Sequence, residues 1–393
     1  MAEVWITGVG AVSAAGLGRE PLVRLLSEGA SAVGRQPAGD EWVGAAPAVG
    51  QGRELRRLDR AGRLFAAAGQ EAWNASGLAV GSFEGPRAGL FEGSSLGPLA
   101  EVAQEARVGR PGSDTRRAAR LSRFMIGSGG ATFAQSHGIH GPVLHLAAGS
   151  VSSACAIGEA FLQVAWGRLD LALAGGGEAP LTEDVLGTFR SAGILGSRDD
   201  WPCRPFDARR QGTVLGEGAG ALVLESAEHA ARRGVPPLAI MAGYAIATAS
   251  CGFAAPEPDG AGVADSAAAA LAMAGTRRIA WIKAHGTGTR VNDLAECRGL
   301  ARLLGGGLPE SPITSIKSSF GHTLGASAGL ETVATLLALE IGIVPGTVGT
   351  ETPDPLLPPC TIATHPQPAP KGDVLVLAES FGGRSVALVV RPI

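Results

Sequence analysis

The stretch G-P-V-L-H-L-A-A-G-S-V-S-S-A-C-A-I-G-E-A, residues 141–160, decides how this chain is interpreted. An apolar run ends at Gly149 and Ser150, and a series of small residues follows at once. This pattern predicts a strand that turns sharply into a helix and presents Ser150 at the helix N-terminus, where the helix dipole favours an anion. The nearest cysteine, Cys155, lies within the expected helix, so we expect it to be a small buried hydrophobic residue.

The composition limits the classes of protein to which the chain can belong. Hydrophobic residues make up 45% of the 393 residues and charged residues only 18%, so we expect another subunit to cover part of the surface. A net charge of −3 and scattered basic residues argue against a nucleic-acid partner. Five cysteines without a C-x-x-C pair favour a reducing compartment. With no signal-like start and no apolar run near ~20 residues, we expect a cytoplasmic protein without a membrane partner.

Strand-like and helix-like segments alternate along the chain, which predicts an α/β protein whose sheets are covered by helices. No linker-like segment divides the chain into independent domains. Polar, arginine-rich residues at 107–120 predict an exposed or partner-facing loop. The glycine runs at 175–178 and 216–220 fit no phosphate-binding pattern, so we expect close packing of backbones there. The expected strands are 4–13, 88–93, 169–179, 219–225, 238–248, 279–284, 374–380 and 385–390, and the expected helices are 58–77, 151–167, 226–233, 262–274, 293–304 and 325–339.

Three further segments carry residues that are suited to chemistry. K-A-H-G-T-G-T-R-V-N-D-L-A-E at 283–296 delivers His285 from a strand to a glycine-threonine loop. S-I-K-S-S-F-G-H-T-L-G-A-S-A-G-L-E at 315–331 holds Lys317 and His322. A-E-S-F-G-G-R-S at 378–385 sets an aromatic residue against a Gly-Gly turn. A lone histidine is usually structural, but two at strand-to-loop positions flanked by glycine and threonine indicate function.

Taken together, these segments resemble the β-ketoacyl synthase branch of the thiolase-like condensing enzymes. The resemblance runs nearly from end to end and rests on motifs in a specific order. The motifs are I-T-G-V-G-A-V-S at 6–13, L-A-G-G-G-E-A at 173–179, R-P-F-D-A-R-R-Q-G-T-V-L-G-E-G-A-G-A-L-V-L-E at 204–225, H-G-T-G-T-x-x-N-D-x-x-E at 285–296 and K-S-S-F-G-H-T-x-G-A-x-A-G at 317–329.

The resemblance implies a five-layered αβαβα sandwich of two similar halves. Residues 1–230 would form the half with the turn at Ser150, and residues 231–393 the half with both histidines. It also implies an acyl carrier protein as partner, substrates carried on the phosphopantetheine of that protein, and a homodimer or heterodimer of ketosynthase-fold subunits. No tightly bound cofactor or metal is expected.

The resemblance also assigns roles to individual residues. His285 and His322 would flank the nucleophile, bind the thioester carbonyl of a malonyl unit and assist its decarboxylation. Lys317 would support them electrostatically, and Glu296 would hold Lys317. Phe381, followed by Gly382, resembles the gating aromatic beside the acyl pocket.

Two positions depart from the family pattern. Ser150 stands where the family has its nucleophilic cysteine, and a serine hydroxyl needs a general base, for which His285 and His322 are the candidates. An oxygen ester is also a poorer acyl donor than a thioester. The second departure is S-F-G-G-R-S at 380–385, where the family usually has Gly-Phe-Gly-Gly-Thr-Asn, so that Arg384 puts a long cation near the pocket wall.

Three functions remain open at this stage. The leading expectation is a partner subunit of the chain-length-factor kind, which pairs with an active ketosynthase and shapes its pocket. The alternative is an active acyltransferase or condensing enzyme that uses Ser150 with His285 and His322, or that decarboxylates without forming an acyl-enzyme. A third interpretation is a serine introduced to trap a substrate.

Overall fold

The structure is a computed structural model of the chain and describes residues 1–36, 40–50, 52, 55–108, 121–250, 252, 257–305 and 311–393. Most of the polar loop expected at 107–120 lies outside these residues. Within the described part, no helix has both the length and the apolar character needed to cross a bilayer.

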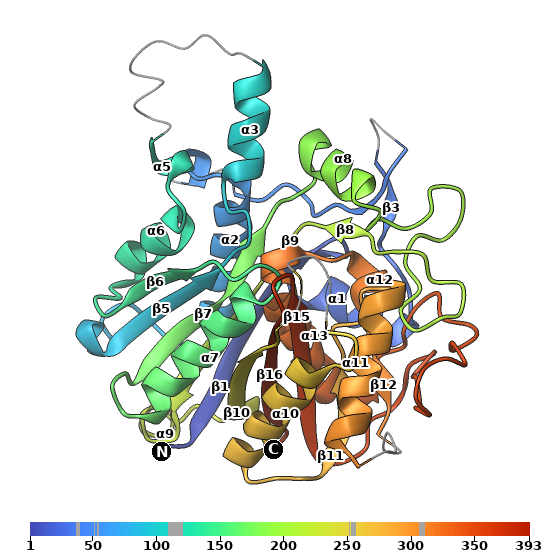
Figure 1. The fold of residues 1–393 in the computed structure, drawn as a ribbon. Helices are drawn as coiled ribbons and strands as arrows, with labels where there is room; N and C mark the ends of the chain where they lie inside the picture. The colour runs from blue at the N-terminus through green and yellow to red at the C-terminus, as the bar shows by residue number, and fades with distance from the viewer. Residues whose placement is uncertain are drawn as a thin grey trace.

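The main sheet is built from two halves with the same strand order (Figure 1). The order across the N-terminal half is β6-β5-β7-β9-β1, and across the C-terminal half it is β12-β11-β15-β16-β10. If the five strands of each half are numbered in chain order, both halves have the spatial order 3-2-4-5-1. The pairing directions also match, with three parallel strands followed by two antiparallel pairings in each half. Antiparallel pairing of β1 with β10 joins the halves.

The expected strands and helices form near their predicted positions, and the structure adds helices that the patterns did not indicate, among them α1, α6 and α8. The strands of the main sheet are β1 (Val4–Ser13), β2 (Gly16–Leu17), β5 (Ala88–Gly93), β6 (Val143–Leu146), β7 (Leu171–Glu178), β9 (Gly218–Ser226), β10 (Ala239–Thr248), β11 (Ile279–Lys283), β12 (Ile313–Thr314), β15 (Asp373–Ser380) and β16 (Arg384–Arg391). The short strands outside it are β3 (Gly34–Arg35), β4 (Trp42–Gly44), β8 (Leu215–Gly216), β13 (Ile343–Val344) and β14 (Gln367–Pro368).

The α-helices of the described chain are α1 (Arg19–Glu28), α2 (Arg60–Ala75), α3 (Leu99–Val108), α5 (Leu121–Phe124), α6 (Ser128–His137), α7 (Ser152–Ala165), α8 (Glu183–Ser191), α9 (Ala227–Arg232), α10 (Ala261–Ala274), α11 (Arg290–Leu303), α12 (Lys317–Phe320) and α13 (Ser327–Glu340). Short 3₁₀ turns are η1 (Leu55–Arg57), η2 (Gly85–Arg87) and η3 (Leu324–Ala326).

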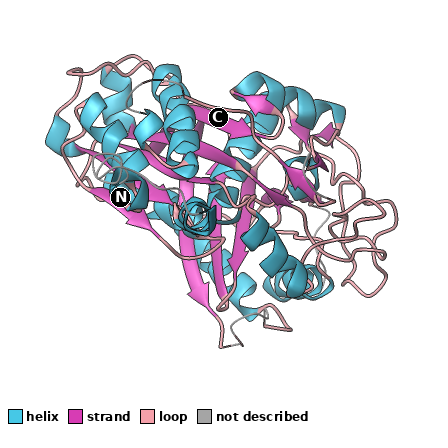
Figure 2. Ribbon diagram, turned by 90° about the horizontal axis from the view of Figure 1, so that it is seen from above, coloured by secondary structure: helices cyan, strands magenta, loops and turns pink. Residues whose placement is uncertain are grey.

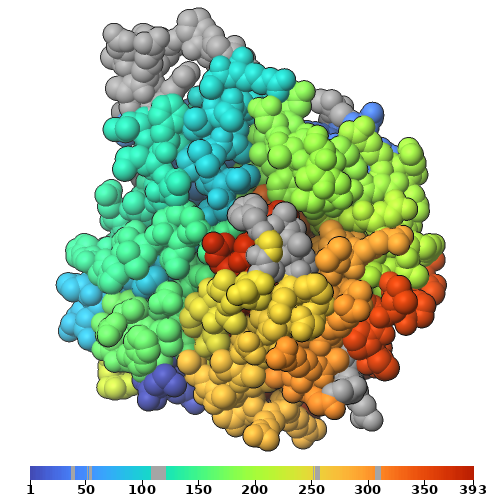
Figure 3. Space-filling model, in the orientation of Figure 1, coloured from blue at the N-terminus to red at the C-terminus, as the bar shows by residue number. Residues whose placement is uncertain are grey.

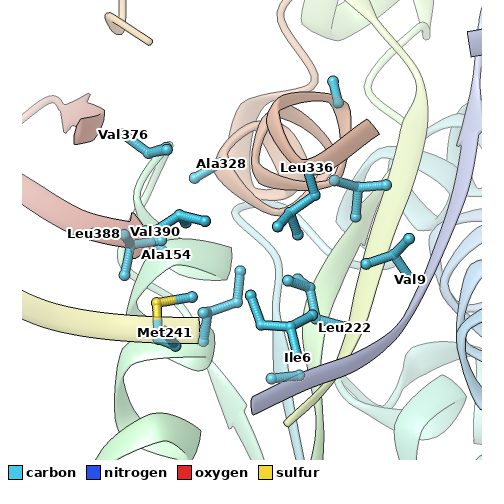
Figure 4. Close-up of a cluster of buried hydrophobic side chains, with 14 of the residues drawn as sticks. Ile6, Val9, Ala154, Leu222, Met241, Ala328, Leu336, Val376, Leu388 and Val390 are labelled. Atoms are coloured by element: carbon cyan, nitrogen blue, oxygen red, sulfur yellow. The ribbon is translucent and has the colours of Figure 1, made fainter. Parts of the chain in front are cut away.

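Helices cover both faces of the strands (Figure 2). α7 and α13 form the middle layer, because α7 packs on β7 and β5 and also touches β10 and β16, while α13 packs on β9 and touches β15. α2 and α10 cover the outer faces, on β1 and β10 respectively. Figure 4 shows the core that results, with Ile6 and Leu222 from one half, Val376 and Leu388 from the other, and Leu336 of α13 between them. Each fully buried aliphatic side chain of this kind contributes about 2 kcal/mol.

Small residues allow the middle layer to approach the sheet closely. α13 is buried along nearly its whole length, which fits a helix without a polar face. A Cβ at Gly220 of β9 would meet the backbone carbon of Gly329 in α13 at 2.4 Å. The expectation that the run at 216–220 marks close backbone packing is therefore confirmed.

This topology brings distant segments to one place. In open parallel arrangements, functional residues follow the carboxyl ends of the strands. The chain beyond β6 leads to Ser150, the chain beyond β11 to His285, and the chain beyond β12 to Lys317 and His322. The end of β15 supplies Ser380.

Candidate active site

Ser150 lies in a tight turn between β6 and α7. Gly149 has φ +67°, a left-handed conformation that glycine adopts without steric cost. The hydroxyl of Ser152 holds the turn, because it accepts a 2.8 Å hydrogen bond from the N–H of Ala148 and donates a 2.6 Å bond to the carbonyl of Gly149. The strand, turn and helix expected at 141–160 are confirmed, with Ser150 just ahead of the positive end of α7.

His322 reaches Ser150 from the opposite half of the molecule. Its Nε2 lies 3.2 Å from Ser150 Oγ, and its Nδ1 lies 2.8 Å from the hydroxyl of Ser327 at the start of α13. Burial lowers the pKa of His322 well below 6.5, and the charges of Lys317 and Lys283 lower it further. The imidazole is therefore neutral near neutral pH and has one nitrogen able to accept a proton.

His285 stands beside His322, with ring centroids 5.4 Å apart and ring planes at 84°. The loop that carries it is held by Glu296 of α11, which accepts hydrogen bonds of 2.6 Å and 2.8 Å from the backbone N–H groups of His285 and Gly286. Burial also lowers the pKa of His285 well below 6.5. The structure thus brings together the two histidines that the motifs indicated.

The expectation that Glu296 holds Lys317 is wrong. Lys317 Nζ donates a 2.6 Å hydrogen bond to Oε1 of Glu331 on α13, and Lys283 Nζ binds the other oxygen of the same carboxylate. Lys283 also donates to the carbonyl of Leu377 at 2.9 Å, and burial lowers its pKa to about 8. Glu296 does not pair with Lys317 because both of its oxygens already accept backbone N–H groups.

A cavity of 560 Å³ opens onto Ser150, His285 and His322. Phe381 and Arg384 line its wall, the latter as the sequence led us to expect. Gly382 lies in the turn between β15 and β16 with φ +82°. In Figure 3 the C-terminal segment reaches the surface at the centre of one face, between the two halves of the chain.

Two residues at the end of β15 belong to the site although the sequence pattern did not single them out. Ser380 Oγ accepts a 3.2 Å hydrogen bond from the backbone N–H of Ser150. Glu379 lines the cavity, and its Oε1 has no hydrogen-bond partner among the described residues. Burial raises the pKa of Glu379 well above 4.5, which favours the neutral carboxyl. Both residues lie within A-E-S-F-G-G-R-S, but the direction of each side chain could not be found from the sequence.

Cys155 is confirmed as a buried small residue. It is 5% exposed, lies within the hydrophobic core on α7, and burial raises its pKa to about 11. Its thiol is therefore protonated and unsuited to act as a nucleophile.

The sequence matches two family models in succession. Residues 1–230 match the β-ketoacyl synthase N-terminal domain, and residues 238–351 match the β-ketoacyl synthase C-terminal domain. The chain belongs to the β-ketoacyl synthase family. The resemblance inferred from the motifs is thereby confirmed.

Individual members of the β-ketoacyl synthase family match nearly the whole chain. The actinorhodin polyketide putative β-ketoacyl synthase 1 of Streptomyces coelicolor is 34% identical, over 99% of this chain and 88% of the relative. The solved ishigamide ketosynthase/chain length factor superposes with a TM-score of 0.90 at 28% identity, covering 100% and 99% of the two chains. A type II polyketide ketosynthase solved with its acyl carrier protein and a hexaketide gives 0.89 at 27% identity, covering 100% of both chains.

The β-ketoacyl synthase architecture expected from the resemblance, a five-layered sandwich of two similar halves, is confirmed by these superpositions and by the repeated strand order. Across the described ranges of this chain, no group of three or more histidine, cysteine, aspartate or glutamate side chains is placed to hold a metal ion.

Proposed function

We propose that this chain takes an acyl group from an acyl carrier protein onto Ser150, as an acyltransferase or condensing enzyme of fatty acid or polyketide synthesis. The observation that carries the proposal is the distance of 3.2 Å between Ser150 Oγ and His322 Nε2. A base within hydrogen-bond reach is what a serine needs in place of the cysteine of the family.

The need for this base follows from acidity. A cysteine thiol has a pKa of about 8.5 and is readily ionised at a helix N-terminus, whereas a serine hydroxyl is far less acidic. A helix dipole worth up to ~2 kcal/mol cannot ionise a serine. When the proton of His322 resides on Nδ1 and is donated to Ser327 Oγ, the lone pair of Nε2 faces the hydroxyl of Ser150.

Ser150 and His322 account for every bond and proton in the acyl transfer. Ser150 Oγ attacks the carbonyl carbon of the acyl thioester, and the new C–O bond forms as the hydroxyl proton passes to His322 Nε2. The C–S bond then breaks, and the same proton passes from Nε2 to the departing sulfur. The products are an acyl ester on Ser150 and a free thiol on the phosphopantetheine arm, and His322 returns to its neutral form.

The cavity suits a substrate carried on such an arm. Thr287, Thr289 and Asn292 line it and offer hydroxyl and amide groups for the amides of phosphopantetheine. Val263 and Leu324 add apolar lining for an acyl chain. The solved complex of a related ketosynthase with its acyl carrier protein supports the same type of partner here.

An exposed apolar edge supports a second subunit of the ketosynthase fold. Among the described residues β6 is the last strand of the sheet, and its Val143 and Leu144 are 39% and 51% exposed. The segment that follows α5 lies against β6, since a Cβ at Gly127 would meet His145 at 3.1 Å. Exposed large hydrophobic residues on and after α5 are Leu121, Phe124, Met125 and Ile126. An unpaired apolar edge strand is a surface that proteins normally cover.

A chain-length-factor-like role, in which this subunit shapes the pocket of an active partner, is the second candidate. One observation favours this role: the backbone N–H of Ser150 already donates a hydrogen bond to Ser380 Oγ. An acyl carbonyl bound for transfer would need the same donor, so its occupation disfavours catalysis at Ser150. The solved ishigamide ketosynthase/chain length factor supports a heterodimer as the form of such an assembly.

The deciding experiment is the intact mass of the protein after incubation with a short acyl group on an acyl carrier protein. Ser150→Ala removes the nucleophile, and His322→Ala removes only the base. An acyl adduct on the wild type that is lost in Ser150→Ala and slowed in His322→Ala would support the proposal. Absence of the adduct, together with a stable complex with a cysteine-bearing ketosynthase, would favour the partner role instead.

A further inference from the structure

The backbone N–H of Ser150 already has a partner inside the site. It donates a 3.2 Å hydrogen bond to Ser380 Oγ, and the Ser380 hydroxyl donates a 3.2 Å bond to the carbonyl of Phe381. Ser380 Oγ also lies close to the preceding residue of the turn, because a Cβ added to Gly149 would lie 2.2 Å from it. Ser380 therefore lies directly over the turn that presents the nucleophile.

The occupied donor matters for acyl transfer. When a side chain attacks a thioester, negative charge develops on the carbonyl oxygen, and donors aimed at that oxygen stabilise the transition state. The N–H of a nucleophile at the start of a helix is suited to this role, since it adjoins the reacting oxygen and shares the positive end of the dipole. The oxygen atom of Ser380 stands where an acyl carbonyl oxygen would accept this hydrogen bond.

We propose that the Ser380 hydroxyl occupies the oxyanion position of Ser150 and that an acyl thioester must displace it before transfer. The inference rests on the proposed acylation of Ser150 and adds a residue that sets the reactivity of that site. Ser380 acts on the acyl carbonyl and not on the chain beyond it. It therefore slows the transfer of all acyl thioesters alike and does not select among chain lengths.

The backbone at this position is ordinary strand, so the substitutions that test this role introduce no backbone strain. Ser380 is the last residue of β15, pairs with Arg384 across the turn, and is not among the residues with positive φ. Its side chain also lines the cavity, so the hydroxyl has space into which it can turn when a carbonyl arrives. Ser380→Ala removes the hydroxyl, and Ser380→Thr retains it as the matched control.

The experiment has two readouts that do not depend on each other. The first is the amide proton shift of Ser150 in protein labelled with ¹⁵N-serine, assigned by the signal that Ser150→Ala removes. The second is the initial rate of acyl-adduct formation from a short acyl chain on an acyl carrier protein, measured by intact mass. Both are measured for wild type, Ser380→Ala and Ser380→Thr.

We expect Ser380→Ala to shift the Ser150 amide proton upfield and to raise the acylation rate about tenfold, the effect of one neutral hydrogen bond that no longer needs to be displaced. Ser380→Thr should match the wild type in both. An unchanged amide shift in Ser380→Ala would overturn the occupancy, and a shifted amide with an unchanged rate would overturn the effect on reactivity. Absence of an adduct from all three proteins would instead reject the proposed acylation, and with it the rate effect, while the amide shift still reports the hydrogen bond.

Discussion

Lys317 and Glu331 form a buried ion pair, and the charge of Lys317 contributes to the lowered pKa of both site histidines. Lys317 Nζ lies 2.6 Å from Glu331 Oε1, and both side chains are 1% exposed or less. The second oxygen of Glu331 binds Lys283, so one carboxylate serves two ammonium groups in the core. A buried charge of this kind is tolerated only while it is paired, so Glu331 is what keeps both ammonium groups in the core.

Replacing Glu331 with glutamine should destabilise the protein strongly. The substitution leaves Lys283 and Lys317 buried without a counter-charge, and the free energy of unfolding should fall by about 3–5 kcal/mol. Urea denaturation followed by circular dichroism would measure it. Glu340→Gln on the same helix is the matched control, because Glu340 pairs with Arg19 at the surface and should cost less than about 1 kcal/mol. Equal losses in the two variants would contradict the importance of the buried network.

Lys317→Met should raise the pKa of His322. Burial is the main cause of the lowered pKa, but the positive charge of Lys317 opposes the imidazolium form, so its removal moves the pKa upward. The acid limb of the profile of acyl-adduct rate against pH should therefore move to higher pH. The shift should be on the order of one unit for a neighbouring buried charge. Lys371→Met, at a site remote from the histidines, should leave the profile unchanged, and an unmoved limb in Lys317→Met would argue against His322 as the base.

Ser150→Cys should convert the site to the chemistry of the wider family. The thiolate is favoured by the N-terminus of α7 and needs no separate base, so acyl-adduct formation should rise by at least about tenfold. The thioester is also the better donor for carbon–carbon bond formation, which product analysis with malonyl on an acyl carrier protein would detect. His322→Ala should impair acylation of the serine protein more than that of the cysteine variant. If Ser150→Cys formed the adduct more slowly than the wild type, the turn between β6 and α7 would not position a nucleophile for attack on a thioester.

Glu379→Leu should stabilise the protein near neutral pH. The buried carboxyl has an oxygen without a partner among the described residues, and such a group costs about 1–3 kcal/mol. The pKa of Glu379 is raised in the native state, so the carboxyl of the unfolded chain loses its proton at lower pH than that of the native protein. The free energy of unfolding of the wild type therefore falls as the pH rises from about 4.5 towards the native pKa. The gain in melting temperature of Glu379→Leu should therefore be larger at pH 7 than at pH 4. Glu379→Gln separates the two effects, because it removes ionisation but retains a polar group.

Local patterns in the sequence were sufficient for most elements of the main sheet and its covering helices, but not for α1, α6 and α8. The run at 141–160 predicted the β6-turn-α7 segment, and Gly149 has the positive φ that such a turn requires. Apolar periodicity and glycine positions depend on neighbouring residues, which explains why they can be found in one sequence. The ordered motifs at 285–296 and 317–329 were sufficient for the family in the same way.

Pairings between distant residues required the tertiary structure. The sequence suggested Glu296 as the partner of Lys317, but the backbone N–H groups of the His285 loop occupy that carboxylate, and Glu331 takes its place. Both glutamates lie on helices next to the site, so only the geometry distinguishes them.

The sequence by itself determined most strands of the main sheet, the helices that pack on it, the family, and the presence of a serine at the nucleophile position. Only the tertiary structure decided which groups reach that serine. Of the two candidate histidines, His322, 172 residues away, lies at its hydroxyl, and Ser380, 230 residues away, accepts from its backbone N–H. The physical reason is that helices, strands and turns arise from interactions between near neighbours in the chain. A proton acceptor and an occupied oxyanion donor depend instead on how two separately formed halves pack against each other.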